Sequence, residues 1–400
     1  MSSEEKKGEK GVFRELYETF FSHSWQMWLG SILLAVMSIF LFLIASPWGS
    51  SGGIVNWGQN LYHNLGLSLE NSAPNGVALI TEYRYAMLSI TVIIGALVSA
   101  LMGKEFAIRV APAGELFKGL IGGLMMGAGC ILAMGCTVGN FFSGLAALSA
   151  GAIIFGIGLF IGVFLSVKYL LWEMDKHPKM SSGKSASILQ AKSKGLSLQP
   201  LAGLIIFIIG LVIVFTVSDI IILSFALIGL FIGILLQRSR WCVVRALREP
   251  FMTGDSEPAV GIIAGIIIGL LGFSIIKFFG IGSETAMVVE NFWMPSIIGG
   301  IIFGFGMTIA GGCTIGSSWR AGEGHVKLWL ALLGIIIAGP LTAEYIKPAF
   351  MNMLPGWMKQ SIFLPDYFTY IGGVIIMILL LLMWYIFVKW NERTGKFTAL

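Results

Sequence analysis

Long apolar runs alternate with short polar segments along most of the chain. Eight runs reach about 20 residues, the length that an α-helix needs to cross the hydrocarbon core of a bilayer. They cover residues 28–46, 83–102, 151–171, 200–217, 219–236, 257–279, 326–347 and 367–390. Two further segments, 119–150 and 297–322, are apolar but rich in glycine. If both also pass through the bilayer, the pattern predicts an all-α polytopic membrane protein with about ten crossings.

Composition and charge placement extend this prediction to topology. The 400 residues are 56% hydrophobic and only 12% charged, whereas soluble proteins carry about 25% charged residues. Lys and Arg gather in the N-terminal tail, in 103–118, 168–199 and 237–250, and after residue 388, while 47–82 and 280–296 contain none. Because loops rich in Lys and Arg stay in the cytoplasm, we expect both termini there, in a bacterial inner membrane. These charges indicate topology, not a nucleic-acid partner.

The same assignments divide the chain into five parts. The expected parts are a cytoplasmic tail at 1–27, a first membrane half at 28–171, a polar cytoplasmic linker at 172–199, a second membrane half at 200–390 and a cytoplasmic tail at 391–400.

The two glycine-rich segments are copies of each other. Residues 122–140 read GGLMMGAGCILAMGCTVGN and residues 299–317 read GGIIFGFGMTIAGGCTIGS. A shift of 177 residues carries Cys136 onto Cys313. The predicted topology runs the two copies through the membrane in opposite directions. This arrangement predicts two inverted repeats whose broken helices meet at mid-membrane, where many transporters bind their substrates.

Each Gly-Cys-Thr sequence is expected to interrupt a membrane helix. Gly135 and Gly312 can adopt the left-handed backbone that ends the first half-helix. The polar side chains that follow can cap the second half-helix, namely Thr137 and Asn140 in one copy and Thr314 and Ser317 in the other. Such a helix N-terminus attracts anions. The alternative is a glycine-rich kink that only serves close helix packing.

Cys136 and Cys313 are the candidate substrate contacts. A thiol is a weak hydrogen-bond donor, and a pore needs contacts that bind an ion without trapping it. The alternative is that these cysteines are small buried hydrophobic residues, but their symmetric placement favours a function. Cys130 aligns with Met307 in the other copy, so we expect it to be a packing residue.

Two more candidates lie in basic segments. Cys242 follows Arg238 and Arg240 at the expected cytoplasmic end of a crossing, and Arg320 follows the second break. Both can attract or release an anion, or both can simply anchor helix ends at the interface. The chain has no C-x-x-C pair and only 4 histidines, so we expect neither a metal site nor a cofactor.

Three motifs resemble those of the YeeE/YedE family of bacterial membrane proteins. They are LAMGCTVGNFFSG at 132–144, RSRWC at 238–242 and FGFGMTIAGGCTIGSSWRAGEGHV at 303–326. The resemblance implies an hourglass of helices with inverted halves, and thiosulfate uptake along three aligned cysteines matching Cys136, Cys242 and Cys313. It also implies a TusA-like soluble sulfur carrier as partner. Length and layout are similar to the longer YedE-type members, linked to selenium.

We therefore expect a transporter that takes up thiosulfate or a related sulfur or selenium anion. A membrane-embedded thiol sulfurtransferase or redox relay is the alternative, and it would need a low-pKa thiolate and usually a resolving thiol. A structural scaffold would explain the 52 glycines but not the symmetric cysteines.

Overall fold

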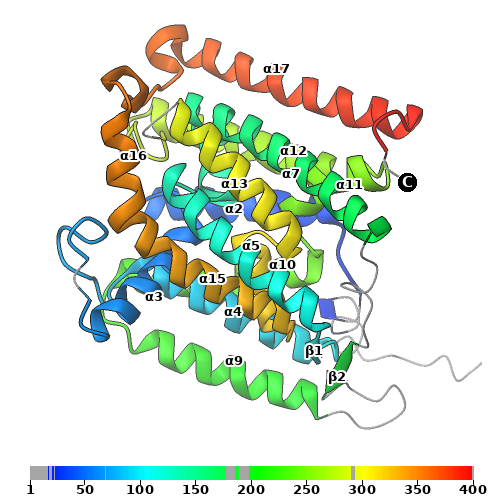
Figure 1. Ribbon diagram of the computed structural model, residues 1–400. Helices are drawn as coiled ribbons and strands as arrows, with labels where there is room; N and C mark the ends of the chain where they lie inside the picture. The colour runs from blue at the N-terminus through cyan, green and yellow to red at the C-terminus, as the bar shows by residue number, and fades with distance from the viewer. Residues whose placement is uncertain are drawn as a thin grey trace, which may run out of the picture.

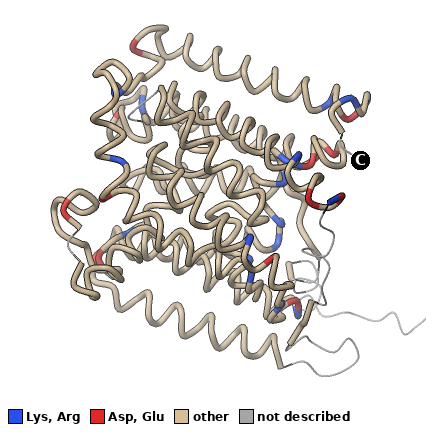
Figure 2. The backbone as a smooth tube through the Cα atoms, in the orientation of Figure 1, with Lys and Arg blue, Asp and Glu red and all other residues tan. Residues whose placement is uncertain are grey.

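The computed structural model describes residues 17, 20–21, 23–67, 69–176, 185–188, 198–289 and 293–398. In these ranges, nine helices are long and apolar enough to cross a membrane. The tenth predicted crossing is α9 (Gln199–Phe215), which is slightly shorter at 17 residues. Charged residues gather toward the two ends of the helices, and the middle of the bundle is almost free of them (Figure 2). The predicted all-α polytopic class is confirmed.

The helices form two similar sets, flanked by peripheral elements. The first set contains α2 (Met27–Ile44), α3 (Ser50–Asn64), α4 (Arg84–Met102), α5 (Ala113–Leu132), the π-helix η2 (Thr137–Phe142), α6 (Ser143–Ala146) and α7 (Ala150–Lys176). The second set contains α10 (Ile220–Ser239), α11 (Val243–Met252), α12 (Glu257–Phe278), α13 (Met294–Ala310), α14 (Thr314–Gly322) and α15 (Val326–Leu341).

The remaining elements lie outside the repeat. They are α9, the π-helix η3 (Thr342–Ile346), α16 (Lys347–Met353), the 3-10 helix η4 (Gly356–Lys359), α17 (Pro365–Thr394) and the strands β1 (Ile108–Val110) and β2 (Ala186–Ile188). Helices α9 and α17 run along opposite sides of the bundle (Figure 1).

A pseudo-two-fold axis relates the two sets. Helix α5 packs on α15 as α13 packs on α7, and α2 packs on α12 as α10 packs on α4. The same axis relates the short helices α3 and α11. Helix α3 contacts α4 and α15, and α11 contacts their counterparts α12 and α7. Helices α5 and α13 contact each other at the centre. The axis therefore passes between α5 and α13.

Glycine makes the central contact possible. A Cβ atom on Gly122 would lie 2.5 Å from the carbonyl oxygen of Gly306, and one on Gly299 would lie 2.7 Å from that of Gly129. An early residue of each helix thus meets a late residue of the other, so α5 and α13 are antiparallel. The repeat is inverted, as predicted, and backbones approach as closely as small residues allow in membrane helices.

Three elements depart from the sequence-based expectation. Helix α3 lies within 47–82, and α11 begins within 237–250 and ends at Met252. Only loops are expected there, because the polar residues of both helices hide them from a hydropathy criterion. Strand β2 lies in the expected flexible linker and pairs antiparallel with β1, Ile108 opposite Ile188. Most of the linker, at 177–184 and 189–197, and most of the N-terminal tail lie outside the described residues.

The central contact predicts a large stability difference between two glycine substitutions. Gly122→Ala should lower the thermal unfolding midpoint by a few degrees, because overpacking costs about 1–3 kcal/mol. Gly210→Ala in α9 is the matched control, since a Cβ atom there would find its nearest neighbour at an ordinary 3.6 Å. The measurement is retention of the monodisperse size-exclusion peak after heating in detergent. Equal midpoints for the two variants would contradict the central role of this contact.

Candidate functional site

Three helices end in the same way before a cysteine. The left-handed residue that ends each helix is Met134 after α5 (φ 59°), Gly311 after α13 (φ 82°) and Arg240 after α10 (φ 52°). Two residues further on, an extended cysteine precedes the next short helix: Cys136 before η2, Cys313 before α14 and Cys242 before α11. Each of these cysteines therefore occupies the N-cap position of a short helix.

The prediction that Gly135 and Gly312 are left-handed is wrong by one position. The N–H of Gly135 donates to the Cys130 carbonyl at 2.8 Å and that of Gly312 donates to the Met307 carbonyl at 3.1 Å. This bond closes the helix end and puts the left-handed angle on the preceding residue. Cys130 and Met307 thus share a backbone role.

The two glycines are instead required for space. A Cβ atom on Gly135 would lie 2.8 Å from the Asn140 Cβ, and one on Gly312 would lie 3.2 Å from the Ser317 hydroxyl. Glycine at these positions lets the second half-helix fold back against the end of the first.

The predicted side-chain caps are also wrong. Asn140 donates through Nδ2 to the Ala133 carbonyl at 2.7 Å, and Ser317 donates to the Gly312 carbonyl at 3.4 Å. Both side chains therefore brace the end of the preceding helix. The buried hydroxyl of Thr314 makes no hydrogen bond within the described part of the chain, whereas that of Thr137 lies against the Cys313 thiol. The unpaired hydroxyl at the second break leaves a donor for a passing ligand.

The thiols and hydroxyls form a continuous series through the centre. Ser50 Oγ lies 3.4 Å from Cys136 Sγ. Thr137, the next residue after Cys136, lies beside Cys313. The sulfur atoms of Cys313 and Cys242 both lie close to Gly316. A Cβ atom on Gly316 would be 3.4 Å from Cys313 Sγ and 3.8 Å from Cys242 Sγ. Ser50 and the three sulfur-bearing side chains are at most 1% exposed, so the series is closed to solvent.

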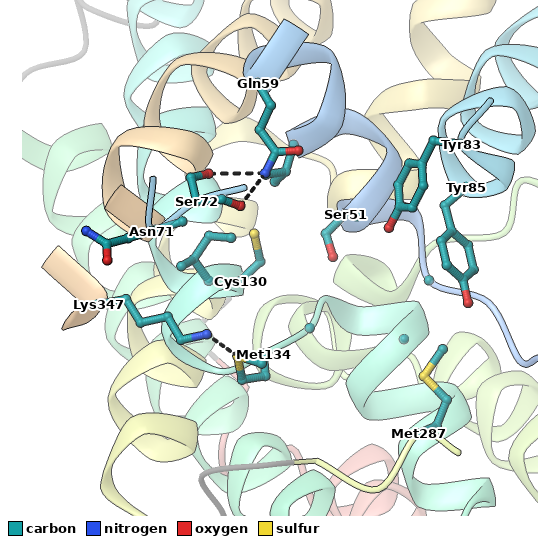
Figure 3. Close-up of a pocket in the computed structure, with 17 residues that line it drawn as sticks. Ser51, Gln59, Asn71, Ser72, Tyr83, Tyr85, Cys130, Met134, Met287 and Lys347 are labelled. Carbon is teal, nitrogen blue, oxygen red and sulfur yellow. Dashed lines mark hydrogen bonds between the residues drawn. The ribbon is translucent and has the colours of Figure 1, made fainter. Parts of the chain in front are cut away.

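A polar cavity, which we name the Lys347 cavity, lies at one end of this series. Its volume is about 390 Å³, and Gly49, Ser51, Gly135 and Gly139 form its inner wall. Lys347 is the one Lys or Arg among the described residues that line it. Its ammonium group approaches Met134 Sδ at 2.9 Å (Figure 3).

Neutral donors and sulfur atoms complete the Lys347 cavity. Tyr83 and Tyr85 contribute phenols on one side (Figure 3). Burial raises the pKa of Tyr83 to about 12, so its hydroxyl keeps its proton at neutral pH and can donate. Cys130 also lines the cavity, although its thiol donates to the Gly127 carbonyl at 3.2 Å. Its side chain is only 3% exposed, so the thiol lies buried at the edge of the cavity.

A second cavity of about 610 Å³, the arginine cavity, lies at the other end. Cys242 forms part of its wall. Among the described lining residues, five are Lys or Arg and one, Glu249, is acidic. The five basic residues are Arg109, Arg245, Arg248, Arg320 and Lys327. Residues of β2 also line it. Figure 1 shows β2 and α16, the helix of Lys347, at opposite ends of the bundle. The polar series thus joins two cavities on opposite sides.

Arg320 connects the arginine cavity to the second break. Its Nη1 donates to the Gly311 carbonyl at 2.8 Å, and its guanidinium group lies 5.0 Å from the centre of the Trp319 ring. The left-handed turn before Cys313 is therefore held by a cation in the cavity wall.

An ion-pair network stabilises the chain segment just before Cys242. Arg240 pairs with Glu105 at 2.8 Å and with Glu323 at 2.6 Å. Arg238, whose side chain is fully buried, pairs with the same Glu105 carboxylate. The network ties the end of α10 to the end of α14, and so fixes Cys242 relative to Cys313. Burying these charges is tolerable because each is paired.

Two contributors to this site carry no signal in the sequence pattern. Lys347 stands at the end of the apolar run 326–347, and Ser50 lies in a segment expected to be a loop. The repeat shift does not reveal Ser50, because α3 and α11 have little sequence in common.

These features define a class: a polytopic membrane protein with two inverted repeats and cysteines at three helix breaks between opposite cavities. The sulphur transport family matches residues 3–165 and 238–399. The chain belongs to this family.

Individual relatives agree with the assignment. The probable transporter YedE of Escherichia coli strain K12 is 27% identical over 390 residues, which cover 93% of this chain and 95% of that protein. YedE of Salmonella typhimurium strain LT2 is 26% identical over 90% of this chain and 91% of its own. The thiosulfate transporter TsuA of Escherichia coli is 32% identical over 117 residues, covering 29% of this chain and 32% of that protein.

The cavities predict an order of reactivity among the four thiols. In variants that retain a single cysteine, Cys242 and Cys130 should be alkylated roughly tenfold faster than Cys136 and Cys313. Alkylation needs an accessible thiolate, and only Cys242 and Cys130 line a cavity. Mass spectrometry of detergent-purified protein treated with a small charged thiol reagent measures the order. Faster labelling of Cys136 or Cys313 would show that the central series is open.

Proposed function

We propose that this protein imports thiosulfate, or a related sulfur- or selenium-containing anion, through Cys136, Cys313 and Cys242. The observation that carries the proposal is the placement of these thiols at three broken helices on one path between two cavities. The family assignment and the similarity to the thiosulfate transporter TsuA support a sulfur anion as substrate. The selenium alternative rests on the resemblance to longer YedE-type members.

The path handles an anion through weak neutral contacts. A thiol donates a weak hydrogen bond, and the N-terminus of α14, a 9-residue helix, adds partial positive charge beside Cys313. A lysine at the same depth would hold a dianion too firmly for conduction. Because Cys136 and Cys313 line neither cavity, turnover requires a local opening between them.

The charge difference between the cavities gives a direction. We assign the arginine cavity to the cytoplasmic side of the bacterial inner membrane by the positive-inside rule, with both chain termini on that side. An incoming anion then moves from a mouth lined by one Lys toward a mouth lined by five Lys or Arg. A TusA-like soluble sulfur carrier would meet the protein at the arginine cavity.

Cysteine substitutions test this function directly. Cys136→Ala and Cys313→Ala should abolish uptake, because each removes a thiol donor at the closed centre, and Cys242→Ala should reduce it strongly. Radiolabelled thiosulfate uptake into proteoliposomes is the primary measurement, with selenite in parallel. Growth of a transport-deficient bacterium on thiosulfate as sole sulfur source is the second.

Cys130→Ala is the matched control for these variants. It removes a buried thiol at the edge of the path, and Met307 serves in the equivalent position of the other repeat, so uptake should stay close to that of the unmodified protein. Expression is checked by immunoblot. Equal loss in Cys130→Ala and Cys136→Ala would contradict the assigned path.

The closeness of Cys242 and Cys313 keeps a thiol relay enzyme as a second candidate. A relay would carry sulfur as a persulfide or disulfide on these residues. We expect no covalent intermediate, since successive S–H contacts suffice to pass an anion. Intact-protein mass spectrometry during turnover, after rapid acid quenching, distinguishes the two. A sulfur adduct on Cys313 or Cys242 that forms and decays at the rate of uptake would establish the relay.

A further inference from the structure

The pseudo-two-fold axis relates four breaks, although only three carry a cysteine. The breaks at Cys136 and Cys313 exchange with each other. The break between α10 and α11, at Cys242, exchanges with the break between α2 and α3. The residue before α3 is Gly49, so the position equivalent to Cys242 has no side chain.

Close contacts confirm that Gly49 is the counterpart of Cys242. Cys242 lies against Gly316 of α14. The repeat shift carries Gly139 onto Gly316, and Gly139 lies against Gly49: a Cβ atom on Gly49 would be 3.0 Å from the Gly139 Cα. The two backbones approach so closely at this break that a side chain at position 49 would require Gly139 to shift by a few tenths of an ångström. The native packing of this break therefore favours glycine over cysteine.

Ser50 supplies the polar atom instead. It is the first residue of α3 and is fully buried. Its hydroxyl contacts Cys136 Sγ at 3.4 Å. On the other side of the axis, Cys242 has the corresponding position beside Cys313. Its neighbours Gly49 and Ser51 line the Lys347 cavity. Ser50 thus stands between that cavity and the first thiol.

We propose that Ser50 is the fourth substrate contact and passes an oxyanion from the Lys347 cavity to Cys136. The inference rests on the proposed transport function and adds a residue that determines entry. A hydroxyl is a stronger donor than a thiol and bonds anionic oxygen at short range. Ser50 therefore suits the oxygen end of the anion, while the three thiols that follow suit its soft chalcogen atom.

The test compares two substitutions of the same residue. Ser50→Ala should lower the initial rate of thiosulfate uptake at subsaturating concentration by about tenfold or more, as expected for loss of a hydrogen bond to a charged ligand. Ser50→Cys should keep the rate within about threefold, because it restores a donor of the type used at the other breaks. Ser166→Ala is the matched control: Ser166 is fully buried in α7 and lines neither cavity.

The outcomes separate this proposal from the function on which it rests. Thiosulfate uptake by the unmodified protein in proteoliposomes, with Ser50→Ala slow and Ser50→Cys active, supports a substrate contact. Unchanged uptake in Ser50→Ala, or equal loss in Ser50→Ala and Ser50→Cys with both variants monodisperse, overturns Ser50 as a contact and leaves the transport function standing. Absence of uptake by the unmodified protein overturns both.

Discussion

The antiparallel contact between α5 and α13 determines the geometry of the rest of the protein. The backbone of α5 contacts that of α13 directly, with Gly122 packed against Gly306 and Gly129 packed against Gly299. This contact lies on the pseudo-two-fold axis, so it sets the separation of the two Gly-Cys-Thr breaks that follow it. Any widening there would move Cys136 away from Cys313. Close backbone packing and the spacing of the two cysteine breaks are thus consequences of one set of glycines.

The apolar pattern was sufficient for the full crossings but not for the short helices. The runs 83–102 and 257–279 agree with α4 (Arg84–Met102) and α12 (Glu257–Phe278) almost residue for residue, because lipid-facing length is what hydropathy measures. Helices α3 and α11 are buried by protein instead of lipid. Their polar residues are therefore tolerated, and a criterion built on transfer to lipid does not find them.

The site was predictable in residue type and only partly in local geometry. The symmetry between the two sequence copies identified Cys136 and Cys313 as candidate site residues, and its positive charge identified Arg320. The left-handed turn was placed one residue too late, because two successive positions are glycine in one copy while the other has Met134 and Gly135. Ser50 and the Glu105 pairs depend on contacts between distant segments, which no local pattern encodes.

Strand β2 has a consequence for how members of this family can diverge. It lies in the segment 166–237 that the family match leaves out, yet Ser185, Ala186 and Ser187 form part of the arginine cavity wall. One part of that wall is therefore formed by residues outside the family match, while the five Lys and Arg residues of the cavity lie inside it. A different segment in place of β2 could change the shape of the arginine cavity while leaving its five Lys and Arg residues in place.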